Sequence, residues 1–405
     1  MMPVAPPSAA DPDRGRGFET MTPRERILTA LDHETPDHTP TDGWFHPEIM
    51  GRLQAHFGTD SEEAVMQCLG IEGWSSLSAT VWFEQFDKVA TTCPAPAGAA
   101  ATDLDGRRAT ARDAASRQQR AVWFDRDNFE DCWGIRWRLG EGGRYVEWRS
   151  GPLEDAGSVR DIEAYAFPTA DHVRGPADYA AEVARLKNQD RYVTAAIDNP
   201  FKRYWHLRGY ENALMDYLGD PELLEAGYDR LFALVTVQAL CAARAGVDMI
   251  KCVGDVAMQD RIIMGRDLWQ RYDKPRWARF IDDVRAIKSD MVFFFHSDGK
   301  LTDLVDDLID VGFTVINPIQ PECMEPVEIK RRYGDRITLH GGISLQRTLP
   351  FGSVDDVRRE VERLIRDCGR DGGLVAMPSN VIQPDTPLEN VIACFHAARD
   401  LRLTA

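Results

Sequence analysis

The second half of the chain alternates short apolar runs with longer amphipathic stretches. The runs are almost continuously apolar, which is typical of parallel strands covered on both faces. The stretches between them carry apolar residues at helical spacing, so strands and helices alternate along the chain. The predicted strands span residues 191–197, 247–253, 291–296, 314–319, 337–343 and 373–379, and helices between them include 221–246, 299–312 and 353–369.

Two further strand candidates, at 39–44 and 71–80, bring the number of predicted strands to eight. Eight parallel strands that alternate with helices favour an α/β fold, a single closed (β/α)8 TIM barrel, over an open sheet. A doubly wound dinucleotide-binding sheet is disfavoured, because no G-x-G-x-x-G motif follows the first strand. The first helix is expected to begin at Thr22, where Thr22, Pro23 and Glu25 match a capping box with proline at the first helical position.

The pattern also predicts how the chain is divided. Residues 1–20 are rich in proline, alanine, aspartate and arginine and predict a disordered N-terminal tail. Residues 21–405 are predicted to form the barrel. Residues 84–170 interrupt its rhythm with an Ala/Thr-rich stretch and then aromatic strands around the glycines of 140–143. This segment predicts an inserted β-hairpin region that covers one mouth of the barrel.

Composition narrows the functional classes. The 405-residue chain has a formal net charge of −17, which disfavours nucleic acid and anionic membrane surfaces as partners. No apolar run approaches the ~20 residues that span a bilayer, and the N-terminus has no signal-peptide core, so we expect a cytoplasmic protein. The eight cysteines include no C-x-x-C pair and are expected to be free thiols. Small-molecule chemistry is the remaining expectation.

Candidate site residues come from one rule. In a parallel barrel the C-terminal strand ends and the loops after them form the rim where active sites lie. The rim candidates are Asp42, His46, Asp198, Asn199, Asp255, Gln259, His296, Asp298, Asn317, Gln320, Glu322, His340, Ser379 and Asn380.

The stretch FFFHSDG at 293–299 is the most informative of these. An aromatic strand delivers His296 to the rim, and Gly299 allows a sharp turn just beyond it. Imidazole and carboxylate oxygen both bind zinc and similar divalent ions, so His296 and Asp298 are candidate metal ligands. The alternative is that Asp298 caps the helix expected near Leu301 while His296 is an ordinary buried histidine.

Other rim residues also allow two interpretations. Asp255 fits a general base or a metal ligand, or an Asx turn that holds its loop. Asp42 and His46 end the first strand, and Trp44 could stack on a flat substrate; alternatively His46 lies on the surface and the aromatics are core.

The segment KRYWHLR at 202–208 follows Asp198 and contains Arg203. A guanidinium group there could bind a substrate carboxylate or phosphate, since its geometry matches those anions. The alternative is a turn at Asp198 followed by a solvated helix face. The chain has no G-x-S-x-G, P-loop or H-E-x-x-H motif, which disfavours serine hydrolase and NTPase chemistry.

The chain resembles the uroporphyrinogen decarboxylase superfamily from about Thr22 onward. The motifs that carry the resemblance are MTPRERILTALDHETPDHTP, NPFKRYWHLRGYENALMDYLGDPEL, FFFHSDGKLTDLVDDLIDVGFTVINPIQP, YGDRITLHGGISLQRTLP and GGLVAMPSNVIQPDTPLENV. They are similar in particular to the branch that includes corrinoid-dependent and coenzyme M methyltransferases. The resemblance implies a single (β/α)8 barrel.

The resemblance also implies site roles. Zinc methyltransferases of the superfamily bind metal with an H-x-C pair and a later cysteine. His296 matches their histidine, whereas Asp298 stands at the first cysteine position and Asn380 near the second. Uroporphyrinogen decarboxylase itself carries an R-Q-A-G-R motif where this chain has TDGWFHP, so its tetrapyrrole reaction is disfavoured.

These observations predict an enzyme that demethylates a small methylated or methoxylated compound by methyl transfer, with a corrinoid protein as partner. A divalent metal, zinc first, is expected on His296 and Asp298, and a homodimer is expected. The predicted catalytic residues are Asp42, Asp255, His296 and Asp298, and the predicted substrate-binding residues are Trp44, His46, Asp198, Arg203, Gln259, Gln320 and Asn380. The alternatives are a decarboxylase of a small aromatic or heterocyclic acid, and a non-catalytic ligand-binding barrel.

Overall fold

The structure is a computed structural model, and it describes residues 21–78, 122–125, 127–140, 146–173 and 176–401. The predicted tail, Cys93 and the first part of the predicted insertion lie outside these residues. Within them, no helix is long and apolar enough to cross a membrane.

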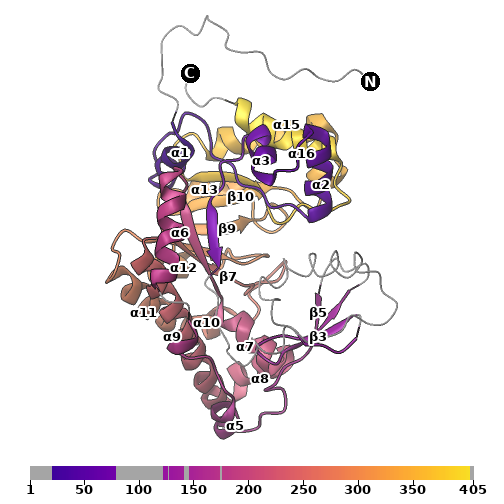
Figure 1. The fold of residues 1–405 in the computed structure, drawn as a ribbon. Helices are drawn as coiled ribbons and strands as arrows, with labels where there is room; N and C mark the ends of the chain where they lie inside the picture. Colours follow the sequence, from indigo (N-terminus) through magenta and orange to yellow (C-terminus); the bar gives the residue numbers. More distant parts are fainter. Residues whose placement is uncertain (1–20, 79–121, 126, 141–145, 174–175, 402–405) are drawn as a thin grey trace, which may run out of the picture.

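Seven parallel strands form one sheet in the order β1-β6-β7-β8-β9-β10-β11. The sheet is curled, and helices surround it (Figure 1). Each strand overlaps a predicted strand, so the predictions of 71–80 and of the six later strands are confirmed. The bounds are β1 Ser75–Ser78, β6 Val193–Asp198, β7 Met249–Val253, β8 Val292–His296, β9 Val315–Ile319, β10 Thr338–Ile343 and β11 Leu374–Pro378.

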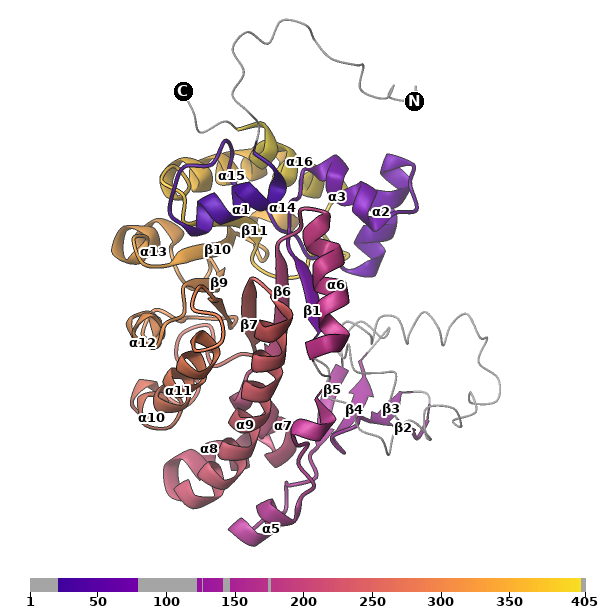
Figure 2. The same ribbon diagram turned by 60° about the vertical axis from the view of Figure 1, so that its left-hand side comes forward.

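Helices connect the strands and cover the outer side of the sheet (Figure 2). The predicted capping box of α1 is present: Thr22 and Glu25 bind each other's backbone N–H groups. The long helix α9 ends where Gly246 adopts the left-handed conformation that a C-terminal cap requires. The bounds are α1 Pro23–Leu31, α2 Pro47–Phe57, α3 Glu62–Leu69, α5 Val159–Ala164, η4 (a 3₁₀ turn) Ala170–His172, α6 Pro176–Asn188, α7 Pro200–Arg208, α8 Tyr210–Gly219, α9 Pro221–Ala245, α10 Arg266–Tyr272, α11 Lys274–Arg285, α12 Val305–Val311, α13 Pro326–Tyr333, α14 Thr348–Phe351, α15 Val354–Cys368 and α16 Leu388–Asp400.

The strand predicted at 39–44 is not formed as a strand. Only isolated parallel bridges occur in this part of the chain, one of them between Thr41 and Ala376 of β11. The Asp42 N–H donates to the Ala376 carbonyl at 3.1 Å, and the Gly73 N–H donates to the Thr41 carbonyl at 3.1 Å. Pro40 has no N–H to donate to a ladder, which explains why the pairing does not extend.

A second, antiparallel sheet in the order β2-β3-β4-β5 lies beside α7 (Figure 2). Its strands are β2 Val122–Trp123, β3 Asn128–Glu130, β4 Arg136–Leu139 and β5 Val146–Ser150. The Trp148 indole N–H donates to the His206 carbonyl at 2.9 Å, and the Leu153 N–H donates to the Leu207 carbonyl at 2.9 Å. These bonds fix the small sheet against α7.

The parallel strands bury both faces, as their continuous apolar runs predict. On β8, Phe293 and Phe295 belong to the large core beneath the helices, whereas Phe294 belongs to a smaller inner core with Trp74 and Met249. Successive side chains of a strand point to opposite faces, so His296 lies on the same side as Phe294. The strand therefore directs His296 to the interior of the curled sheet.

Candidate metal centre

Residues toward the C-terminal ends of three neighbouring strands, β7, β8 and β9, lie side by side in the sheet. In the parallel register Val253 of β7 is beside His296 of β8, and His296 is beside Asn317 of β9. Asp255 follows β7 by two residues and Asp298 follows β8 by two residues. Parallel strands end at the same edge of a sheet, so these side chains converge there, as the rim rule predicts.

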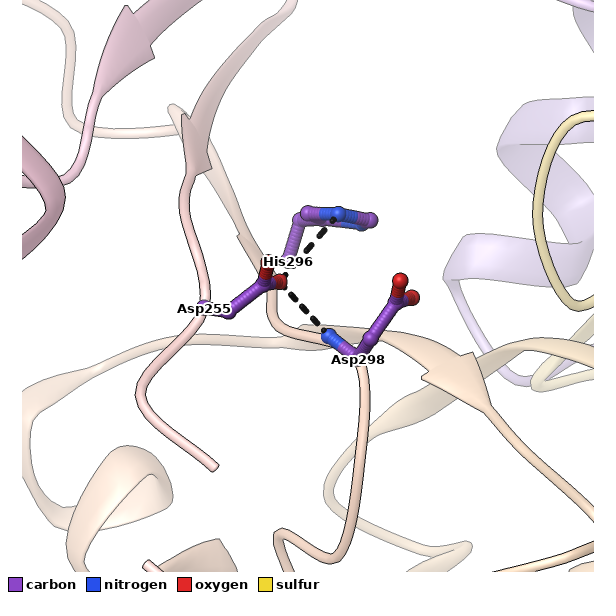
Figure 3. Close-up of side chains that lie close together, drawn as sticks. All are labelled: Asp255, His296 and Asp298. Carbon is purple, nitrogen blue, oxygen red and sulfur yellow. Dashed lines mark hydrogen bonds and ion pairs between the residues drawn. The ribbon is translucent and has the colours of Figure 1, made fainter. Parts of the chain in front are cut away.

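Asp255, His296 and Asp298 form a cluster (Figure 3). One ligand atom from each of the three lies within 4.8 Å of the others, and His296 Nε2 is 3.8 Å from Asp255 Oδ1. Metal–ligand distances of ~2.0–2.2 Å place two ligands of one ion roughly 3–4 Å apart, which this separation fits. The Asp298 N–H donates to Asp255 Oδ1 at 2.9 Å and ties the two loops together.

Asp298 has a buried carboxylate oxygen, Oδ1, that lacks a hydrogen-bond partner within the described residues. Burial and the neighbouring Asp255 carboxylate raise the pKa of Asp298, while His296 and Asn380 oppose the rise. Two carboxylates facing one imidazole in a half-buried setting would be stabilised by a divalent cation. The alternative that Asp298 caps the next helix is wrong, because α12 begins only at Val305, with Leu304 at its N-cap.

Two predicted substrate-binding residues lie next to this cluster. Gln320 Oε1 accepts the Gly299 N–H at 3.1 Å, and its Nε2 donates to Gln259 Oε1 at 3.4 Å. Gly299 turns the chain with φ of 92°, as predicted, and a Cβ there would lie 2.4 Å from the Met258 carbonyl oxygen. Only glycine therefore fits this turn.

Asn380, also predicted to bind substrate, contacts Asp298. Its Nδ2 donates to Asp298 Oδ2 at 2.6 Å. Its Oδ1 accepts the N–H of Val381 at 2.7 Å and is thereby occupied. Asn380 thus holds the carboxylate of Asp298 from outside the cluster.

A buried line of polar side chains continues inward from His296. His296 Nδ1 is 2.5 Å from Asn317 Oδ1, and Asn317 Nδ2 is 2.6 Å from His340 Nδ1. His340 Nε2 is 3.3 Å from Asp42 Oδ2. Burial alone would raise the pKa of Asp42, but the neighbouring His340 and Lys251 and the Gly43 N–H hold it below its usual value. Asp42, predicted to be catalytic, is thus the inner end of this line and not part of the metal cluster.

Lys251 is a residue that the rim rule missed. It lies inside β7 and is buried, with its ammonium 6.0 Å from the centre of the Phe294 ring. Burial lowers the pKa of Lys251 to about 8, and the charge of Asp42 limits the fall. The signal in the sequence is a lone lysine inside the apolar run VDMIKCV.

Trp44 and His46, the two candidates that follow Asp42 in the first loop, have different surroundings. Trp44 lies near the line, with its ring centroid 6.0 Å from that of His296 and 6.3 Å from that of His340. His46 is buried, so the alternative of a surface residue is wrong. Its Nδ1 accepts the Glu48 N–H at 3.2 Å, which makes His46 the N-cap of α2.

Asp198 and Arg203 form a different group, between β6 and the small sheet. The Arg203 guanidinium binds Asp198 and stacks on Trp133, 4.5 Å from the ring centre. Arg203 is 4% exposed, so the alternative of a solvated helix face is wrong. The group joins α7 to the antiparallel sheet.

The fold and this rim cluster define a barrel-type α/β protein with a candidate metal site at its strand ends. A family model for uroporphyrinogen decarboxylase (URO-D) matches residues 139–401, and the chain belongs to this family.

Two curated relatives and one solved structure refine the comparison. The relatives are named methylcobamide:CoM methyltransferase MtaA, from Methanosarcina barkeri and from its strain Fusaro; each is 29% identical over 180 residues, 44% of this chain and 49% of the relative. The chain thus matches about half the length of these relatives. A solved methyltransferase from Methanosarcina mazei is similar in fold, with a TM-score of 0.61 and 21% identity over 94% of this chain and 98% of that one.

Proposed function

We propose that this protein is a metal-assisted methyltransferase that demethylates a small methylated or methoxylated compound. The observation that carries the proposal is the cluster of Asp255, His296 and Asp298 at the strand ends of a URO-D family fold. Methyltransferases among the similar proteins support the reaction class. The name of these proteins, methylcobamide:CoM methyltransferase, supports a corrinoid carried by a partner protein as the methyl acceptor, which would leave as the methylated corrinoid.

The donor set suits a divalent ion. One imidazole and two carboxylates fit zinc or a harder ion, and the unpartnered Oδ1 of Asp298 is the kind of atom that a metal satisfies. No cysteine of the described residues belongs to the cluster. A bound divalent ion would act as a Lewis acid on a substrate oxygen or carboxylate. The chain's own residues position that oxygen: Gln259 and Gln320 offer amide groups beside the cluster, and Trp44 offers an apolar surface next to His296.

We also propose that the sheet closes as an eight-stranded barrel, with 39–42 as the eighth member. The hydrogen bonds of Thr41 and Asp42 to Gly73 and Ala376 support this, since they join the segment to both ends of the sheet. The antiparallel pairing of β4 with β5 supports the inserted hairpin within 84–170. A homodimer and a cytoplasmic location stay predictions from the sequence.

Metal analysis and a transfer assay test the function. Purified protein should contain about one divalent ion per chain, and His296→Ala should lose it, whereas the exposed control His56→Ala should keep it. Incubation with cob(I)alamin and a panel of methoxylated and N-methylated compounds should yield methylcobalamin and the demethylated product. Release of carbon dioxide from an aromatic acid without methylcobalamin formation would favour the decarboxylase instead. A metal-free protein with no turnover in either assay would refute both enzymes and leave the non-catalytic ligand-binding barrel.

A further inference from the structure

The amide of Asn317 stands between two histidines in a site closed to water. Asn317 and His340 are fully buried and His296 is 8% exposed. A neutral imidazole carries its proton on one nitrogen and a lone pair on the other, and the hydrogen bond of one nitrogen decides the state of the other. Asn317 contacts Nδ1 of both rings, so one amide group acts on both tautomers.

The orientation of the amide follows from a third contact. Asn317 Nδ2 also lies 3.4 Å from the backbone carbonyl oxygen of His340, which can only accept. Turning the amide over would place Oδ1 against that carbonyl oxygen, and two acceptors would then face each other. The amide therefore presents Oδ1 to His296 and its N–H group to His340.

We infer that Asn317 is a positioning residue that fixes the tautomers of His296 and His340 in opposite senses. At His296, Oδ1 accepts the proton of Nδ1, so the lone pair lies on Nε2, the atom that faces Asp255. At His340, Nδ1 accepts and the proton lies on Nε2, which faces Asp42 Oδ2. His340 Nε2 and Asp42 Oδ2 lie 3.3 Å apart, and neither has a hydrogen-bond partner within the described residues, so a proton on Nε2 would give each of these buried atoms its nearest available partner.

The consequence concerns the metal site and rests on the proposed function. A histidine that binds metal through Nε2 needs its lone pair there, and a hydrogen bond accepted from Nδ1–H keeps it there. Partners of this kind typically contribute 10- to 100-fold to metal affinity. Asn317 thereby prepares His296 as a ligand before any ion arrives, and the same amide connects the ligand to the buried Asp42 end of the line.

The test is ¹⁵N NMR of histidine-labelled, metal-free protein together with zinc affinity. Wild type should show His296 protonated on Nδ1 and His340 on Nε2, with assignments from His296→Gln and His340→Gln. In Asn317→Leu neither histidine should be held in a single tautomer, and zinc binding should weaken 10- to 100-fold. Asn317→Asp keeps an acceptor for His296 and removes the donor to His340. It should therefore retain zinc binding within a few-fold while only the His340 signals change.

The outcomes are separable. A wild-type spectrum with His296 protonated on Nε2 overturns the inference, as does a folded Asn317→Leu variant that binds zinc as tightly as wild type. If Asn317→Leu fails to fold, the wild-type spectrum and Asn317→Asp decide the question. If wild type binds no zinc, the proposed function fails, whereas the tautomers of the metal-free protein still confirm or refute the role of Asn317.

Discussion

Replacing the buried Lys251 by methionine should change how the stability of this protein depends on pH. Methionine keeps a long flexible chain in the same space beside Phe294 and removes only the charge. Burial lowers the pKa of Lys251 from 10.5 to about 8, so the fold disfavours its charged form. At 1.36 kcal/mol per pH unit, this penalty amounts to about 3 kcal/mol below pH 8.

The sign follows from proton counting. Between pH 8 and 10.5 the unfolded chain holds a proton on Lys251 that the folded protein has released. This residue therefore increases the free energy of unfolding of wild type as pH rises, a gain in stability. The gain is complete above pH 10.5 and is lost as pH falls through 8. Lys251→Met has no such group. Its stability relative to wild type should therefore be about 3 kcal/mol more favourable at pH 7 than at pH 10.5.

Urea unfolding followed by tryptophan fluorescence at several pH values measures this difference. The pKa of about 8 already includes the attraction between the Lys251 ammonium and the Asp42 carboxylate, so about 3 kcal/mol is the net change expected between the two pH values. The control Lys288→Met removes a lysine that pairs with Asp290 at the surface, and its effect should stay within about 1 kcal/mol. A constant difference between Lys251→Met and wild type from pH 7 to 10.5 would falsify the assignment of a suppressed charge.

Two further substitutions test the turn at the site and a buried carboxyl. Gly299→Ala should destabilise the protein by ~2 kcal/mol or more and lower its metal content, because the new Cβ meets the Met258 carbonyl at 2.4 Å and φ is 92°. Gly219→Ala is the control, since a Cβ there has open space around it. Equal melting temperatures for the two variants would contradict the argument. Burial raises the pKa of Asp273 to about 7 although Tyr217 donates to it at 2.8 Å, so wild type loses stability as pH rises from about 4 to 7. Asp273→Asn should therefore gain roughly 3 kcal/mol relative to wild type between pH 5 and pH 8 in urea titrations, and an unchanged difference would count against the raised pKa.

The parallel strands could be predicted because their runs are apolar on both faces. The run at 291–296 became β8 almost residue for residue. What the sequence hides is the direction of each side chain: three consecutive phenylalanines conceal that Phe294 and His296 point inward together. Hydrophobicity alone carries no such alternation when both faces are buried.

The candidate site, like the fold, could be predicted only in part. The rim rule brought Asp255, His296 and Asp298 together, because it needs only the ends of the strands. The pairing of Asn317 with two histidines depends on the register between β8, β9 and β10, which no single strand specifies. Asp198 was expected at the rim and Arg203 in the segment after it, but the Trp133 ring on which Arg203 stacks comes from a segment whose packing the strand pattern does not describe.

The parallel bridge between Thr41 and Ala376 joins the first segment of the chain to β11, and this joint affects how the protein folds and opens. Its two sides come from opposite ends of the chain, whereas β6 to β11 are linked in order through single crossovers. Each doubling of the closed loop costs only about 0.6 kcal/mol, but this joint has few hydrogen bonds to offset the entropy of closing nearly the whole chain. It should form last and exchange its amide hydrogens first. Local opening there would wet Asp42 and leave β7, β8 and β9, which carry the metal ligands, assembled.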